Sequence, residues 1–186
     1  MIQRHNGLFL GTLAASGIGT IISLLVAALI LVKYPQIRAD IYRNKSFNRM
    51  ADRKPCRVYA APFGVRLPTG NENSDQEINT VVEPDITVVC GQSKLDDRGC
   101  KGAPDLIIEI VSPASVKNDM LKKFNPYERA GVKEYWIVEP NGKIVTVFIL
   151  GDNGRYGRQE VYAEDDEIQV NVFKDLKINL KPVFAY

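Results

Sequence analysis

Histidine is almost absent from this 186-residue chain, and the single one, His5, lies ahead of a long apolar run near the amino terminus. Beyond that run the sequence contains no histidine. This absence excludes catalysis by Ser-His-Asp or Cys-His groups, and histidine-ligated zinc, from residues 33–186. If this part of the chain is an enzyme, carboxylate, lysine, tyrosine or hydroxyl groups must carry its chemistry.

Cysteine is scarce as well, since the chain has three, Cys56, Cys90 and Cys100, and no CxxC pair. An odd number without that spacing argues against a structural zinc site and against a disulfide framework. Disulfides are rare in the cytoplasm. We therefore expect three reduced thiols in a cytoplasmic domain.

Charge is missing from residues 7–32, a run of 26 residues that also lacks Asn, Gln and His. This length is enough to span a bilayer with some tilt, so residues 1–35 are predicted to form a hydrophobic, membrane-spanning helix. A cleaved signal peptide is disfavoured because the run is too long and no A-x-A-like site follows it. A buried helix of a soluble fold is the alternative.

Basic residues gather directly after this run. Residues 36–66 carry eight basic and two acidic side chains, whereas residues 67–186 carry 14 basic and 20 acidic ones. The positive-inside bias predicts a single-pass protein with its C-terminal part in the cytoplasm, and the alternative is a wholly cytoplasmic protein. Residues 36–55 would form a basic linker or helix, and residues 56–186 the folded domain.

Small residues recur at every fourth position of the apolar run and would let two such helices approach closely. A homodimer is therefore left open. The members of this ridge are Gly7, Gly11, Ala15, Gly19, Ser23 and Ala27.

Beyond residue 56, short apolar segments alternate with turn signals and predict a mixed α/β sheet with flanking helices. A helix is expected from Ser115 to Ala130, ended by Gly131 and kinked or divided at Pro126. An Asn141-Gly142 hairpin turn is expected. The predicted strands cover residues 57–67, 80–90, 105–111, 134–140, 143–150, 155–162, 167–172 and 176–180.

The segment 105–111 is apolar on both faces, which is typical of a central strand covered by helices. Glu109 interrupts it, and an unpaired charge there would be costly, so a metal or a cationic partner is expected. Leu106, Ile108 and Ile110 should share one face. The other face would take Asp105, Ile107, Glu109 and Val111.

A second acid, Asp85, lies in an apolar segment 24 residues before Glu109. Adjacent strands could bring both carboxylates to one edge of the sheet, although acids at strand ends are more often solvated or paired with a cation. Two carboxylates can hold Mg²⁺, which polarises a phosphate and activates water. A nearby lysine can neutralise the charge that develops on that phosphate.

The ordered motifs "EPDITVVC", "GAPDLIIEIVSP", "KF…Y" and "AGVKEYWIVEP" resemble the Uma-two branch of the PD-(D/E)XK nuclease superfamily, from about Cys56 to the C-terminus. The resemblance implies a restriction-endonuclease-like fold and Mg²⁺- or Mn²⁺-dependent cleavage of DNA. Asp85 and Glu109 fall on the superfamily's two metal-binding acids. The first 55 residues do not match what such proteins usually carry.

The superfamily's usual lysine, two residues after the glutamate, is replaced here by Val111. In the resembled branch the lysine comes from the next helix, which points to Lys123, with Lys122 as the fallback. The catalytic set is therefore Asp85, Glu109 and Lys123. Secondary candidates are Asp105 as an outer metal contact, Asp119 as a support for Lys123, and Lys122 and Tyr127 on the helix.

Basic side chains suggest where nucleic acid could bind. Arg129, Lys133 and the basic stretch 38–57 could meet nucleic-acid phosphates, or anionic lipid beside the span.

Three functions compete. The first is a metal-dependent DNA endonuclease, the second an inactive nucleic-acid-binding or membrane-anchored relative, and the third a phosphohydrolase of small phosphate esters.

Residues 7–32 are predicted to hold the chain in a membrane. After washing with carbonate and with high salt, the full-length protein should stay in the membrane fraction, because such washes release proteins held by charge alone. Recovery of the full-length chain in the soluble fraction would contradict the span and favour a buried helix.

Overall fold

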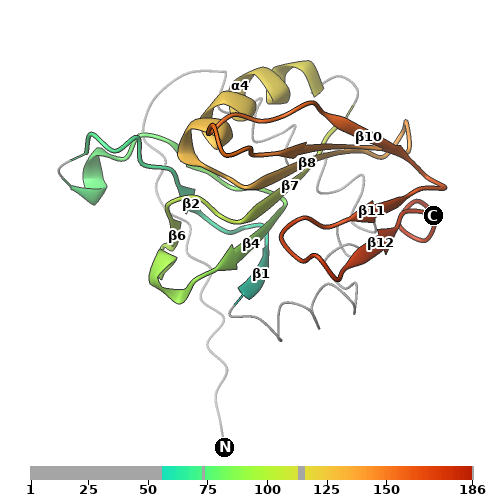
Figure 1. The fold of residues 1–186 in the computed structure, drawn as a ribbon. Coiled ribbons are helices and arrows are strands. Elements are labelled where there is room, and N and C mark those ends of the chain that lie inside the picture. Colours follow the sequence, from blue (N-terminus) through green and yellow to red (C-terminus); the bar gives the residue numbers. More distant parts are fainter. Residues whose placement is uncertain (1–55, 73, 113–115, 186) are drawn as a thin grey trace, which may run out of the picture.

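The computed structural model describes residues 56–72, 74–112 and 116–185, with the side chains of 116–121 left out (Figure 1). The apolar run, and with it the predicted segments 1–35 and 36–55, lies outside the described residues. Within the described part, no helix is both long and apolar enough to cross a membrane.

The main sheet has six strands and is antiparallel except for one central parallel pair, β7 with β8 (Figure 1). The helix α4 (Val116–Ala130) makes the crossover between these two strands, as a parallel pair requires. The mixed sheet predicted for residues 56–186 is therefore confirmed, and among the described residues α4 is the one α-helix. The strand order is β1 (Cys56–Ala60), β4 (Ile86–Cys90), β7 (Leu106–Ile110), β8 (Glu134–Glu139), β9 (Ile144–Ile149), β10 (Glu160–Ala163).

Two smaller sheets complete the fold. One has the order β3 (Val81–Val82), β2 (Val65–Arg66), β6 (Gly99–Lys101), β5 (Leu95–Asp96), and the other pairs β11 (Glu167–Gln169) with β12 (Lys177–Asn179). Short 3₁₀ helices occupy Asp75–Glu77 and Gln92–Lys94. The single strand expected over 80–90 is wrong, because the chain passes from β3 to β4 and so from one sheet to another. Residues 91–104, which lie between two predicted strands and where no strand is predicted, contain β5 and β6.

The main sheet buries both of its faces. On one face α4 and the β2–β3 region pack over Ile107, Val111 and Tyr135, and on the other the β11–β12 pair and the C-terminal residues cover Leu106, Ile108 and Trp136. The two-faced pattern predicted for residues 105–111 is thus confirmed. Side chains alternate along β8, so Tyr135 faces α4 and Trp136 faces the opposite core.

The helix α4 continues through Pro126, so the expected division is wrong. A proline removes one backbone N–H donor from the hydrogen bonds of the helix. The burial of Tyr127 and its neighbours stabilises the helix enough to offset that loss. The helix ends where the sequence predicts. Gly131 has φ 87°, and the amides of Gly131 and Val132 both donate to the Tyr127 carbonyl, at 3.1 and 3.0 Å.

The turn between β8 and β9 differs from the expected Asn-Gly type. The amide of Lys143 donates to the Pro140 carbonyl at 3.2 Å, and it is Lys143, not Gly142, that takes the positive φ of 50°. A turn followed by a left-handed residue is the usual three-residue alternative to a two-residue hairpin loop. The hairpin itself is as predicted.

The expected set of three reduced thiols is wrong, because Cys56 and Cys90 form a disulfide and Cys100 is the free, buried cysteine. The cause lies in the register. Cys56 is directly opposite Cys90 where β1 pairs with β4, and sequence spacing alone does not reveal cross-strand neighbours. The disulfide fastens the edge strand β1 to the sheet.

A buried carboxylate, Glu134, connects the sheet to the C-terminal layer. Its oxygens accept hydrogen bonds from the Trp136 indole at 2.9 Å and from the amides of Asn171 and Val172 at 3.1 and 2.9 Å. Burial raises the pKa of Glu134, while these three donors lower it. A group with three donors and full burial is a fixed part of the core.

We predict that Glu134→Gln lowers the free energy of unfolding by about 1–3 kcal/mol. The amide nitrogen of Gln would face an N–H donor, which leaves a buried donor without an acceptor. Urea denaturation at neutral pH measures the effect, with the exposed Glu160→Gln as control. Equal stability of the Glu134 variant and the wild type would contradict this role.

Candidate active site

Asp85 and Glu109 lie beside each other on adjacent antiparallel strands. The register pairs Ile86 with Ile108, so the next residue before β4, Asp85, comes opposite Glu109. The amide of Ile110 donates to Asp85 Oδ2 at 2.8 Å, and the amide of Ala61 donates to its backbone carbonyl at 3.0 Å. The two sequence-predicted carboxylates are therefore brought together and held by backbone contacts.

Glu109 is buried under α4, with 4% of its surface exposed. Its Oε1 accepts a hydrogen bond from the Tyr127 hydroxyl at 2.7 Å and lies 2.9 Å from Lys123 Nζ. Lys123 and Tyr127 are four residues apart on one face of the helix, as the sequence indicates. One carboxylate oxygen thus receives a cation and a neutral donor from the same helix.

The pKa of Glu109 is raised by burial and, to a smaller extent, by the negative charge of Asp85. The positive charge of Lys123 and the Tyr127 hydrogen bond oppose this rise without cancelling it. Burial, followed by the charge of Glu109, raises the pKa of Tyr127 well above its ordinary value, so this hydroxyl stays a donor. Lys123 and the Tyr127 hydroxyl offset only part of the repulsion and burial cost of these two neighbouring carboxylates. Such a pair favours the binding of additional positive charge.

Val111 occupies the place of the usual lysine because that position is part of the core. Its side chain is 2% exposed and packs in the cluster beneath α4. Lys123 supplies the amine from the helix instead, and 28% of its side chain is exposed. The ammonium group therefore reaches both the buried carboxylate and the solvent.

The secondary candidates have different positions. Asp105 is 1% exposed and contacts Lys133 at 2.7 Å, Lys94 at 3.4 Å and the Cys90 amide at 2.7 Å. It lies four residues before Glu109 on an extended strand, which is about 13 Å along the chain. Asp105 is thus engaged in an ion-pair network of its own, and this geometry does not support an outer metal contact.

Of the two further helix candidates, the structure describes the side chain of one. Lys122 is exposed to solvent, and the side chain of Asp119 lies outside the described residues. The structure therefore distinguishes the two lysines, since Lys123 contacts Glu109 and Lys122 points to solvent.

The donor set fits a hard divalent cation that is shared with a substrate. Among the described residues no group of three or more His, Cys, Asp or Glu side chains gathers at one place. Mg²⁺ usually binds through one or two carboxylates together with waters and substrate phosphates. Asp85 and Glu109 provide that number of carboxylates, so the residues present suit such an ion.

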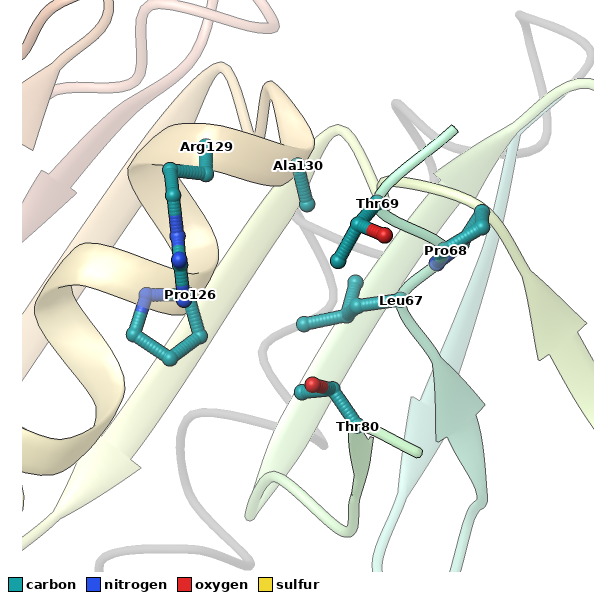
Figure 2. A pocket seen from close by; sticks show the side chains of 7 residues that line it. All are labelled: Leu67, Pro68, Thr69, Thr80, Pro126, Arg129 and Ala130. Carbon is teal, nitrogen blue, oxygen red and sulfur yellow. The ribbon is translucent and has the colours of Figure 1, made fainter. Parts of the chain in front are cut away.

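A pocket that sequence reasoning missed lies next to this site, between α4 and the β2–β3 region (Figure 2). Pro126, Arg129 and Ala130 form its helix wall. The opposite wall comes from the end of one predicted strand, the residues directly after it and the start of the next predicted strand, and no motif in the sequence marks these residues as a pocket. Its members there are Leu67, Pro68, Thr69 and Thr80.

The fold is shared with a solved nuclease-like protein. The crystal structure described as "a putative nuclease belonging to DUF820", from Anabaena variabilis, superposes with a TM-score of 0.61 and 19% sequence identity. The match covers 82% of this chain and 80% of that one. This likeness shows that the two chains share a mixed β-sheet fold.

The family follows from the sequence itself. The family described as "Uma2: Putative restriction endonuclease" matches residues 37–181, more than half of the chain, so the protein belongs to that family. The resemblance drawn from the motifs is thereby confirmed, and the match begins at residue 37, so the expectation that the first 55 residues lie outside the family pattern is wrong for residues 37–55. Among curated proteins, none matches this sequence.

The Tyr127 hydroxyl is predicted to stabilise the fold through buried Glu109. Tyr127→Phe removes a donor to a buried, charged acceptor and should lower the free energy of unfolding by about 1–3 kcal/mol. Chemical denaturation measures this loss.

Tyr162→Phe is the matched control, because the Tyr162 hydroxyl donates to Glu160, an exposed carboxylate, at 2.6 Å. That change should cost less than about 0.5 kcal/mol. Equal losses in the two variants would contradict a larger contribution from the buried Tyr127–Glu109 hydrogen bond than from the exposed Tyr162–Glu160 one.

Proposed function

We propose that this protein is a metal-dependent endonuclease that hydrolyses phosphodiester bonds of DNA. Asp85 and Glu109 would bind Mg²⁺ or Mn²⁺, and Lys123 would act on the phosphate. The observation that carries the proposal is the convergence of the three groups, with Lys123 Nζ 2.9 Å from Glu109 Oε1 and Asp85 opposite Glu109 on the neighbouring strand. Membership of the Uma2 family supports it.

Each residue has a distinct part in this proposal. Asp85 and Glu109 bind and orient the cation, and the backbone amide of Ile110 fixes the Asp85 carboxylate. Lys123 neutralises charge that develops on the phosphate. In other enzymes, removal of one preorganised donor to such a charge lowers the rate by about 100- to 1,000-fold. Tyr127 holds Glu109 in place and excludes water from beneath it.

A bound divalent ion would supply a Lewis acid for the phosphate and would lower the pKa of a water molecule. Glu109 and Asp85 would offer such an ion two carboxylates from opposite positions on neighbouring strands. Lys123, being partly exposed, can turn from the carboxylate toward an incoming phosphate without leaving the site.

The location remains part of the proposal. Residues 7–32 would anchor the protein in a membrane with the nuclease-like domain on the cytoplasmic side, and close packing of two such helices would give a homodimer. A wholly cytoplasmic protein is the alternative.

Lys123→Ala is predicted to reduce Mg²⁺-dependent nicking of supercoiled plasmid DNA by at least about 100-fold. Lys122→Ala is the matched control, since Lys122 is the adjacent, exposed lysine and its loss should leave nicking close to the wild-type rate. Gel electrophoresis with Mg²⁺ and with EDTA measures the reaction.

Calorimetry separates the role of Lys123 from metal binding, because Lys123→Ala should still bind Mn²⁺ whereas Glu109→Ala should not. Full activity of Lys123→Ala, or unchanged Mn²⁺ binding by Glu109→Ala, would refute the assignment of that residue. Cleavage of a small phosphodiester without cleavage of DNA would favour a phosphohydrolase. Binding of DNA without any cleavage would favour an inactive relative.

A further inference from the structure

The pocket beside the site shares the helix α4 with Lys123 of the proposed catalytic set, whereas Asp85 and Glu109 belong to the neighbouring main sheet. Pro126 directly precedes Tyr127 on α4, and Thr80 leads through β3 toward Asp85. The Leu67 amide donates to the Thr80 carbonyl at 2.9 Å, which fixes the second wall. A strand of substrate that contacts Lys123 would have this pocket within reach, because Pro126 lies about one helical turn further along α4.

The lining combines an apolar surface with one cation. Figure 2 shows the side chains of Leu67, Pro126 and Ala130 around the cavity, with Arg129 extended along the helix wall above Pro126. The Thr69 hydroxyl is turned away from the cavity, where it donates to Glu72 at 2.8 Å. Backbone and hydroxyl hydrogen bonds from Thr69 lower the pKa of Glu72 to about 2, so this anion is bound to its own loop.

Arg129 is exposed and forms no ion pair with any residue in the described ranges. Its sequence neighbour Glu128 is engaged elsewhere, because it accepts from Arg155 at 2.7 Å and from the Tyr156 amide at 2.8 Å. Nearby Lys133, the other helix-end cation, is paired with Asp105. Arg129 thus brings positive charge to the rim of the pocket without a carboxylate that neutralises it.

The size of the pocket limits what it can hold. The cavity measures about 90 Å³. Sites that enclose a whole small ligand are typically about 300–1,000 Å³. The space suits one ring-sized apolar group with an anion beside it. A ring and an anion together correspond to one repeating unit of a polymeric ligand.

On the basis of the proposed function, we propose that this pocket is a subsite for one sugar-phosphate unit of the DNA strand next to the scissile bond. Arg129 binds the phosphate, and Leu67, Pro126 and the methyl group of Thr69 contact the face of the sugar. Because these contacts are to the backbone, the subsite positions the strand and does not select a base sequence.

The test compares Arg129→Gln with Lys174→Gln, which removes the same charge from an exposed residue on the β11–β12 connection, across the sheet from α4. Fluorescence anisotropy with a short duplex DNA of mixed sequence, in EDTA and in Ca²⁺, gives the affinity at several salt concentrations. Arg129→Gln should weaken binding by about threefold to tenfold and make the logarithmic salt slope shallower by about 1. Lys174→Gln should change neither quantity, and Arg129→Lys should regain part of the affinity.

The outcomes separate the subsite from the reaction. If wild type and Arg129→Gln bind DNA with the same affinity and salt slope, the subsite is wrong while the nuclease proposal stands. A wild type that binds no DNA in either buffer also overturns the subsite, and plasmid nicking then decides the proposed function separately. An Arg129-dependent affinity in a protein that never cleaves DNA would support Arg129 as a contact to the DNA backbone and would refute both the endonuclease and the place of the subsite beside a scissile bond. Thermal unfolding of each variant checks that the helix is intact.

Discussion

The burial of Glu109 is the constraint on which the arrangement of this domain depends. A carboxylate on the face of a central strand must find positive charge or donors, since an uncompensated charge there is costly. The helix α4 meets that need by placing Lys123 and Tyr127 on one oxygen, 2.9 and 2.7 Å away. The same contact fixes the rotation of the helix over the sheet, and with it the position of the pocket wall at Pro126 and Arg129.

Much of this could be predicted from the sequence, because it depends on local patterns. The alternation of residues 105–111 predicted which face carries Glu109, and Gly131 marked the end of the helix. The four-residue spacing placed Lys123 and Tyr127 together. Asp85 was found through the family motif, and its position opposite Glu109 needed only that two consecutive strands of the main sheet be neighbours.

What the sequence did not reveal depends on pairing between distant segments. The disulfide requires Cys56 and Cys90 to be opposite each other across β1 and β4, and no spacing rule gives that register. The burial of Asp105 depends on Lys94, from the 3₁₀ helix Gln92–Lys94, and Lys133, from the segment after α4, converging on it. The pocket exists because a short strand of the second sheet approaches α4, and β2 has two residues, too few for a periodic signal.

Glu109 and Glu134 are buried on opposite faces of the two parallel central strands, and each connects the sheet to a different covering layer. Glu109 does so through the side chains of Lys123 and Tyr127, whereas Glu134 does so partly through the backbone amides of Asn171 and Val172. A backbone donor is present in every residue except proline. The two layers should therefore tolerate different amounts of sequence change. Many residue types at positions 171 and 172 would keep the backbone amides that bind Glu134 and so hold the C-terminal layer in place. The helix keeps its contact only while a cation and a hydroxyl occupy their two places.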